Sequence, residues 1–276
     1  MLDKATYINH LNQTIEFGSN GIYISSSELR DYEWLYDSNY NEITNFHKDV
    51  VEKSFKIIIY GPDEATALTV KNRIFEVFER DILFNEPGRM YINGFYCNCF
   101  IKASKKERWF INKRYLECQI TMVTDQPDWK EEKTFSFVKS EQQQESDLNL
   151  KKYDYTYPYF YKNQISSDRI QNNAVVESDF LLRVYGPTAN PVIMIGENVY
   201  QVNVIVGQGE RLEVDSDNKS IYLIHTNGRK ENIYWSASKL SYIFEKIPTG
   251  LQVVAWDGSF AWDLILINSR SEPIWL

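Results

Sequence analysis

The sequence is poor in the residues from which most catalytic and metal-binding sites are built. Its 276 residues include only three cysteines and three histidines, His10, His47 and His225. No histidine lies beside a cysteine or pairs with another histidine at helical spacing, so the pattern of a zinc site is missing. The chain has neither a GxSxG nucleophile elbow nor a glycine-rich phosphate loop in front of a helix. We therefore expect no enzyme, no cofactor and no bound metal ion.

The sequence also lacks long hydrophobic runs and a surplus of positive charge. No apolar run approaches the ~20 residues that a membrane helix needs, and residues 1–13 lack the apolar core of a signal peptide. The formal net charge is −8, and residues 1–138 carry 17 basic and 21 acidic groups while residues 139–276 carry 13 and 17. Neither half is basic, which argues against a protein that binds a nucleic-acid backbone. We expect no nucleic-acid partner, no insertion into a membrane, and a chain that is made and folded in a cytoplasm.

The few cysteines do not indicate a disulfide framework. Cys97 and Cys99 stand two residues apart, so on a strand they share one face, and Cys118 leaves an odd number. In a cytoplasm such residues stay reduced. We expect three structural thiols.

Aromatic residues and short strand-like runs are abundant instead. The chain has 19 Tyr, 15 Phe and 7 Trp, residue types that favour sheets. Asn93–Gly94 between two apolar runs is a strong hairpin signal, because both residues tolerate positive φ. The strands that we expect in the first half are Thr14–Phe17, Ile22–Ser25, a segment around Tyr32–Tyr36, Ser54–Tyr60, Arg89–Ile92, Phe95–Ile101, Trp109–Phe110, Tyr115–Val123 and Thr134–Val138.

One helix is expected in the first half, over Asp63–Phe84. Asp63 and Glu64 place negative charge at the positive end of the helix dipole. Apolar residues then recur at spacings of three and four, as in a helix that covers a sheet. They are Ala67, Val70, Ile74, Val77, Phe78 and Ile82. One helix against many strands predicts an α+β, sandwich-like first domain.

The second half shows strand signals almost throughout. Turn residues separate short apolar runs at a spacing that predicts a β-sandwich or barrel. The whole chain is therefore expected to be mainly β. The strands expected here are Phe180–Tyr185, Val192–Ile195, Val199–Val204, Arg211–Val214, Ser220–Ile224, Asn232–Trp235, Ile243–Ile247, Leu251–Trp256 and Phe260–Ile267.

A tyrosine ladder marks the middle of the chain. In Lys151–Asn163 five tyrosines occupy every second position, which places their rings on one face of an extended segment. Pro158 excludes a central strand, so an edge strand or an extended connector is expected. The polar run Lys139–Asn149 before it is typical of an exposed loop. We therefore predict a first domain over residues 1–138, a connector over 139–163 and a second domain over 164–276.

One local pattern has the residue types of a sugar site. His225, Asn227 and Arg229, with Trp235 further along, are similar to the HxNxR strand and stacking tryptophan of galectins. Asn227–Gly228, however, reads as a hairpin turn, which would put His225 and Arg229 on opposite strands rather than one. We expect that these four residues do not form a sugar site.

An ordered series of motifs resembles the siphophage distal tail proteins. PGRMYINGFYCNCFIKASKK (87–106), Tyr115–Val123 and TDQPDW (124–129) resemble the N-terminal domain of that family, and the tyrosine ladder resembles its interdomain connector. GPTANPVIMIGENVYQVN (186–203), ERLEVDSDNKSIYLI (210–224), FEKIPTGLQVVAWDG (244–258) and SEPIW (271–275) resemble its C-terminal galectin-like domain. The resemblance covers about residues 15–276.

The resemblance implies a structural hub without catalytic residues. Distal tail proteins form a ring, usually hexameric, at the end of the tail tube, so the expected partners are copies of this chain, the tail tube protein and a tail-tip protein. Receptor-binding proteins are a further expected class of partner, and the distal end of the virion tail is the expected location. A galectin-like second domain is also implied. The alternative is an adhesin that recognises a cell-wall glycan of the host through this second domain.

Overall fold

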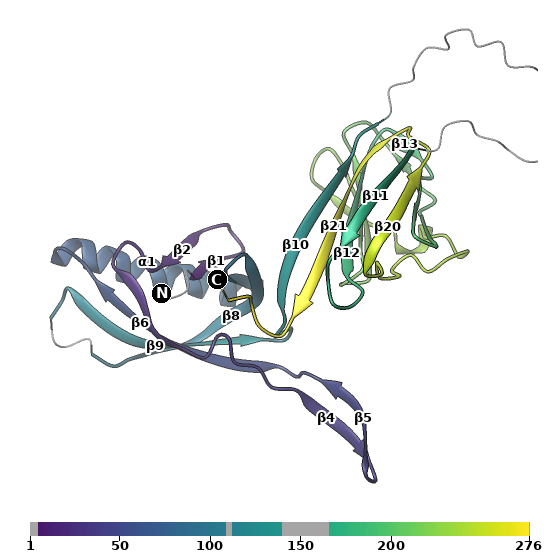
Figure 1. The fold of residues 1–276 in the computed structure, drawn as a ribbon. Coiled ribbons are helices and arrows are strands. Elements are labelled where there is room, and N and C mark those ends of the chain that lie inside the picture. Colours follow the sequence, from purple (N-terminus) through teal and green to yellow (C-terminus); the bar gives the residue numbers. More distant parts are fainter. Residues whose placement is uncertain (1–4, 109–111, 140–165, 276) are drawn as a thin grey trace, which may run out of the picture. The chain divides into compact units, whose positions relative to one another are not determined.

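This computed structural model describes residues 5–108, 112–139 and 166–275 (Figure 1). Among these residues the protein is mainly β, with one α-helix. The fold class expected from the sequence is thereby confirmed. By its internal contacts the chain divides into two units, Met1–Glu131 together with Ser269–Leu276, and Glu132–Asn268. Two strands, β10 (Trp129–Phe137) and β21 (Ala261–Arg270), run across this division.

Two antiparallel sheets share one long strand in the first unit. β8 (Phe95–Lys106) pairs through its first half with β7 (Gly88–Ile92) and through its second half with β9 (Tyr115–Thr124). One sheet has the order β10-β8-β7-β1-β2 and includes β1 (Ala5–Ile8) and β2 (Thr14–Phe17). The other has the order β8-β9-β6-β3 and includes β6 (Val51–Tyr60) and β3 (Ile22–Ser27). Asn93 and Gly94 adopt φ values of 50° and 85° between β7 and β8, as the predicted hairpin requires.

The helix α1 (Glu64–Phe84) packs against both sheets and begins where its acidic residues predict. Asp63 caps it by accepting a hydrogen bond from the backbone N–H of Thr66 at 2.8 Å. The buried side chains Ala67, Ile74, Val77 and Phe78 confirm most of the expected apolar stripe. Ile82 was assigned to this stripe wrongly, because its side chain is 44% exposed and Asp81 occupies the buried position instead.

Asp81 is fully buried because two residues at the end of β1 satisfy its carboxylate. The hydroxyl of Tyr7 donates to Oδ2. The backbone N–H of His10 donates to Oδ1 at 3.0 Å, and Nδ1 of the same histidine lies 2.5 Å from Oδ1. Burial, with the neighbouring acidic groups, raises the pKa of Tyr7 far above its usual value, so the hydroxyl stays a donor. This cluster ties the helix to β1.

Two sheets enclose a single apolar core in the second unit. One has the order β19-β18-β17-β12-β21-β10, with β19 (Lys230–Asn232), β18 (Ser220–Ile224), β17 (Arg211–Asp215) and β12 (Asp179–Tyr185). The other has the order β11-β20-β14-β15, with β11 (Ser166–Asn172), β20 (Gly250–Trp256), β14 (Val192–Ile195) and β15 (Asn198–Gln201). A short pair, β13 (Thr188–Ala189) and β16 (Ile205–Val206), completes the unit. Buried side chains of both sheets meet in the core, where the rings of Phe180 and Tyr200 lie 5.1 Å apart.

Two of the strands expected in the second half are wrong. At Asn232–Trp235 the strand β19 ends with Asn232, whose Oδ1 accepts the N–H of Tyr234 at 3.0 Å, and the turn leads into a 3-10 helix, η1 (Tyr234–Ser236). Ile243–Ile247 is a turn with one isolated bridge from Ile247 to Ser178. Its apolar residues are buried without alternation, a pattern that does not distinguish a strand from a buried turn.

Two further predictions lie outside the described residues. They are the strand at Trp109–Phe110 and the tyrosine ladder of Lys151–Asn163, together with most of the polar run before the ladder.

Candidate assembly surfaces

A two-stranded hairpin of the first unit is exposed on both faces. β4 (Leu35–Asn39) pairs with β5 (Glu42–His47) in a sheet of their own, and Figure 1 shows the hairpin extending away from the start of β6. Residues 31–46 are all exposed, and Tyr40 at the tip is 99% exposed. We call residues 31–49 the arm.

The arm has one apolar face and one acidic face. Tyr36 pairs across the strands with Phe46, their rings lie 6.4 Å apart, and Ile43 follows on the same face. Asp37 and Glu42 lie on the other face. An isolated two-stranded hairpin is marginally stable in water, and apolar residues that gather on an exposed surface mark a site of interaction. The arm is therefore well suited to contact another molecule.

Contacts within the first unit fix the root of the arm. Lys48 Nζ lies 2.5 Å from Asp128 Oδ1 and 4.3 Å from the centre of the Trp34 ring. Close by in the sequence, the guanidinium of Arg30 lies 3.9 Å from the centre of the Trp275 ring, in the C-terminal segment that belongs to this unit. Cation–π contacts and a part-buried ion pair of this kind hold the root in place. The arm thus projects from an ordered base.

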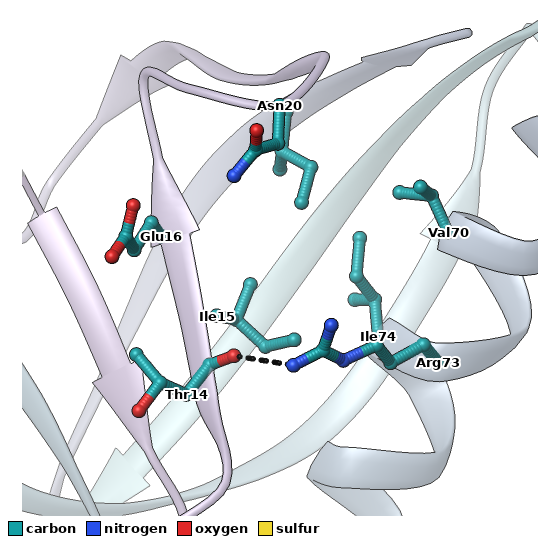
Figure 2. A pocket seen from close by; sticks show the side chains of 8 residues that line it. Thr14, Ile15, Glu16, Asn20, Val70, Arg73 and Ile74 are labelled. Atoms are coloured by element: carbon teal, nitrogen blue, oxygen red, sulfur yellow. Dashed lines mark hydrogen bonds between the residues drawn. The ribbon is translucent and has the colours of Figure 1, made fainter. Parts of the chain in front are cut away.

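A cleft of about 290 Å³ opens between β2 and α1 (Figure 2). Ile15 and Ile74 are buried side chains of its lining, and Glu16 and Arg73 add one charge of each sign. Figure 2 shows Arg73 reaching toward β2, where its Nη2 lies 3.4 Å from the backbone oxygen of Thr14. The lining contains no nucleophile beside a general base, so the cleft is better suited to receive a partner's side chain than to perform catalysis.

The structure places His225 and Arg229 on either side of the Asn227 turn. The N–H of His225 donates to the backbone oxygen of Arg229 at 3.0 Å, and the side chain of Asn227 accepts the N–H of Arg229 at 2.9 Å. His225 Nδ1 lies 2.6 Å from Glu210 Oε1, and Nε2 lies 2.9 Å from Glu231 Oε2.

Protein carboxylates therefore occupy both ring nitrogens of His225. Its hydrogen bonds to Glu210 and then Glu231 raise the pKa of His225, and the bond to His225 lowers the pKa of Glu210. A sugar hydroxyl would have to displace one of these carboxylates to reach the ring.

Trp235, the fourth residue of the candidate sugar set, lies in an exposed loop. It is 91% exposed and meets the ring of Tyr234 edge-on at 5.6 Å, while Leu240 in the same loop is 92% exposed. The N–H of Ser238 donates to the backbone oxygen of Gln201 in β15 at 3.0 Å, which fixes the loop along that strand. The loop is a second surface suited to a partner, and only the tryptophan in it was singled out from the sequence.

The described residues offer little chemistry of other kinds. None of their His, Cys, Asp and Glu side chains form a group of three or more that could hold a metal ion. No helix among them is long and apolar enough to cross a membrane. Cys97, Cys99 and Cys118 are buried and unpaired, and burial raises the pKa of Cys118 to about 11. These thiols are therefore poor nucleophiles at neutral pH.

Comparison with known proteins places the fold among phage tail components. No protein-family model matches the chain. No curated protein matches it either. The crystal structure of SPP1 Dit (gp 19.1), described as a paradigm of the hub adsorption apparatus in phages that infect Gram-positive bacteria, matches with a TM-score of 0.57 at 9% identity and covers 98% of this chain and 100% of its own.

Two structures of the phage P2 baseplate agree with this comparison. A chain of the activated baseplate with Ca matches with a TM-score of 0.63 at 11% identity, over 99% of this chain and 100% of its own. A chain of the same baseplate with Sr matches with a TM-score of 0.62 at 11% identity, over the same shares. The protein therefore has, over almost its whole length, the fold of SPP1 Dit and of a phage P2 baseplate component.

Proposed function

We propose that this protein is a structural component of a phage tail that forms a ring at the distal end of the tail tube. In this role it joins the tube to the tail tip and to the parts that adhere to the host. The motif series in its sequence and the fold that it shares with SPP1 Dit support this proposal. A role without catalysis fits the chemistry of the described surfaces, since the described residues of the cleft beside α1 include no catalytic set.

The arm is the single observation that carries the proposal of self-assembly. A ring requires a heterologous interface, in which one surface of a copy meets a different surface of the next copy. The arm projects from one end of the sheet that contains β6 and exposes Tyr36, Ile43 and Phe46 on one face. We assign it to the contact between neighbouring copies in the ring, for which the family resemblance implies six copies.

The other partners follow from the same role. The tail tube protein and a tail-tip protein would meet the two sides of the ring. The exposed loop around Trp235 and Leu240 gives the second unit a surface on which receptor-binding proteins could be carried. Assembly would take place in the host cytoplasm.

A glycan-binding adhesin is the second candidate function. Trp235 is its strongest support, because a ring that is 91% exposed is available to stack on a sugar. A glycan array probed with the full chain tests it. Binding that is lost in Arg229→Ala with an unchanged thermal melt would favour the adhesin over our proposal.

Light scattering of the full chain tests the ring. We expect the mass of a closed oligomer, and a shift toward monomer in the double variant Tyr36→Ser, Phe46→Ser, because exposed side chains contribute little to folding but much to an interface. The matched control is Val175→Ser, Val176→Ser in the second unit, where both side chains are also exposed. A wild-type chain that stays monomeric at high concentration and binds neither tube nor tail-tip protein would contradict the proposal.

A further inference from the structure

We propose that the acidic arm of one copy docks on a basic surface at the opposite end of the same sheet in the next copy. The proposal rests on the ring function given above and names the two surfaces that meet. The occupant of the basic surface is thus a second copy of this chain.

The arm carries a strong negative charge. Residues 31–49 contain five acidic residues and one basic residue, a formal net charge of −4. The basic residue is Lys48, which already pairs with Asp128 at 2.5 Å. The acidic residues are all exposed, and they are Asp31, Glu33, Asp37, Glu42 and Asp49.

The opposite surface is the end of β8 and the start of β9. Residues 104–108 and 112–114, which we call the basic end, contain five basic residues and only Glu107 as an acid, a formal net charge of +4 in a chain of net −8. The basic residues are Lys105, Lys106, Arg108, Lys113 and Arg114. A surplus of this size against the charge of the whole chain indicates an acidic partner.

Acidic neighbours neutralise only part of the basic end. Lys113 Nζ lies 2.7 Å from Glu64 Oε1, and Arg108 Nε lies 3.4 Å from Glu117 Oε2. Within the described part of the chain, no ion pair engages the other three basic side chains. These are Lys105, Lys106 and Arg114.

The basic end also carries aromatic side chains. The guanidinium of Arg114 lies 5.1 Å from the centre of the Tyr60 ring, and that ring is 48% exposed. Lys106 Nζ lies 4.1 Å from the centre of the Phe75 ring. The arm and the basic end therefore both carry aromatic side chains, and their charges are opposite in sign.

The geometry of β6 places the two surfaces at opposite ends of one sheet. The arm leads into β6 at Val51, and β6 ends at Tyr60, which pairs with Tyr115 at the start of β9. Through β9, Lys105 and Lys106 lie level with Lys56 and Ile57 of β6, about 15–20 Å along the strand from Val51, and Arg114 lies beside Tyr60, about 30 Å from Val51. If each arm binds the basic end of the next copy, the same contact repeats around the assembly. Two arms would instead repel each other, because their charges are alike. Such a heterologous contact closes into a ring when its rotation permits.

Charge reversal in the full chain tests the contact. The arm variant combines Asp37→Lys with Glu42→Lys, and the basic-end variant combines Lys105→Glu with Lys106→Glu. The matched control combines Lys139→Glu with Lys239→Glu in the second unit. We expect the protein concentration at which half of the chains are assembled to rise about tenfold or more in the arm variant and in the basic-end variant, because like charges then face each other. The control should assemble at the same concentration as the wild type. Raising the salt from about 0.1 M to about 1 M, which shortens the screening length from about 10 Å to about 3 Å, should weaken the wild-type ring.

Mixing the two reversed variants gives the decisive result. In the mixture each positive arm can meet a negative end and each negative arm a positive end, so we expect the ring to return when neither variant forms it alone. Thermal melts confirm that both variants are folded. Rings that form regardless of both reversals, or that fail to return on mixing, would overturn the docking proposal and leave the ring function standing. A wild-type chain that forms no ring would overturn both.

Discussion

The buried carboxylate of Asp81 accepts hydrogen bonds from two residues of the first unit. Asp81→Ala leaves the hydroxyl of Tyr7 and the N–H of His10 without their acceptor in the core. We expect the free energy of unfolding to fall by roughly 3 kcal/mol, because each buried donor left unsatisfied costs about 1–3 kcal/mol. Urea-induced unfolding measures this. Glu79→Ala on the exposed side of the same helix should change it by less than about 0.5 kcal/mol, and equal effects of the two would contradict the account.

His225 should titrate above the ordinary histidine range. Its pKa is raised by Glu210 and then Glu231, so the protonated form is favoured in the folded state. Its contribution to stability is therefore fully present below about pH 6.5, the pKa of an unperturbed histidine, and is lost as the pH rises through the raised folded value. An NMR titration of the imidazole protons measures the shift directly. Glu231→Gln should lower the pKa of His225, and a wild-type pKa at or below 6.5 would show that the carboxylates do not hold this ring.

At the scale of elements, α1 provides a matched pair of isoleucines. Ile74 is 1% exposed and Ile82 is 44% exposed on the same helix. We expect Ile74→Ala to lower the free energy of unfolding by roughly 2–5 kcal/mol, because a cavity remains in the core, and Ile82→Ala to cost much less. Chemical denaturation of the two variants measures the difference. Similar losses would mean that the packing of the helix on the sheets is different from that described.

The helix, most strands and the hairpin at Asn93 were predictable because local signals agree with the tertiary structure. Capping by Asp63, apolar spacing and turn residues act within a few positions of each other. The burial of Asp81 was not predictable, because its partners Tyr7 and His10 lie more than seventy residues away. No sequence period reveals a partner at that distance.

The arm shows a different limit of sequence patterns. Tyr32, Trp34 and Tyr36 alternate with polar residues, as in a half-buried strand, yet all three are exposed. Alternation shows that one face of a strand is apolar. It does not show whether that face packs against the same chain or against another copy. Two strands, β1 and β11, gave no clear signal, since Ala5–Ile8 is short and Ser166–Asn172 is largely polar.

At the scale of the whole molecule, the two units differ in what they offer a partner. The first has the charged arm and the basic end, and the second has the fixed loop at Trp235. The candidate sugar residues were named from sequence alone, but the engagement of His225 by Glu210 and Glu231 depends on the pairing of β17, β18 and β19. That long-range pairing lies beyond a local motif, which is why the motif alone did not reveal it.

Electron microscopy of the purified chain distinguishes a ring from a monomer by its shape. We expect closed rings with a central channel, because a heterologous interface between the arm and the basic end repeats around an axis until it closes. Individual monomers at high concentration, or open filaments that never close, would contradict it.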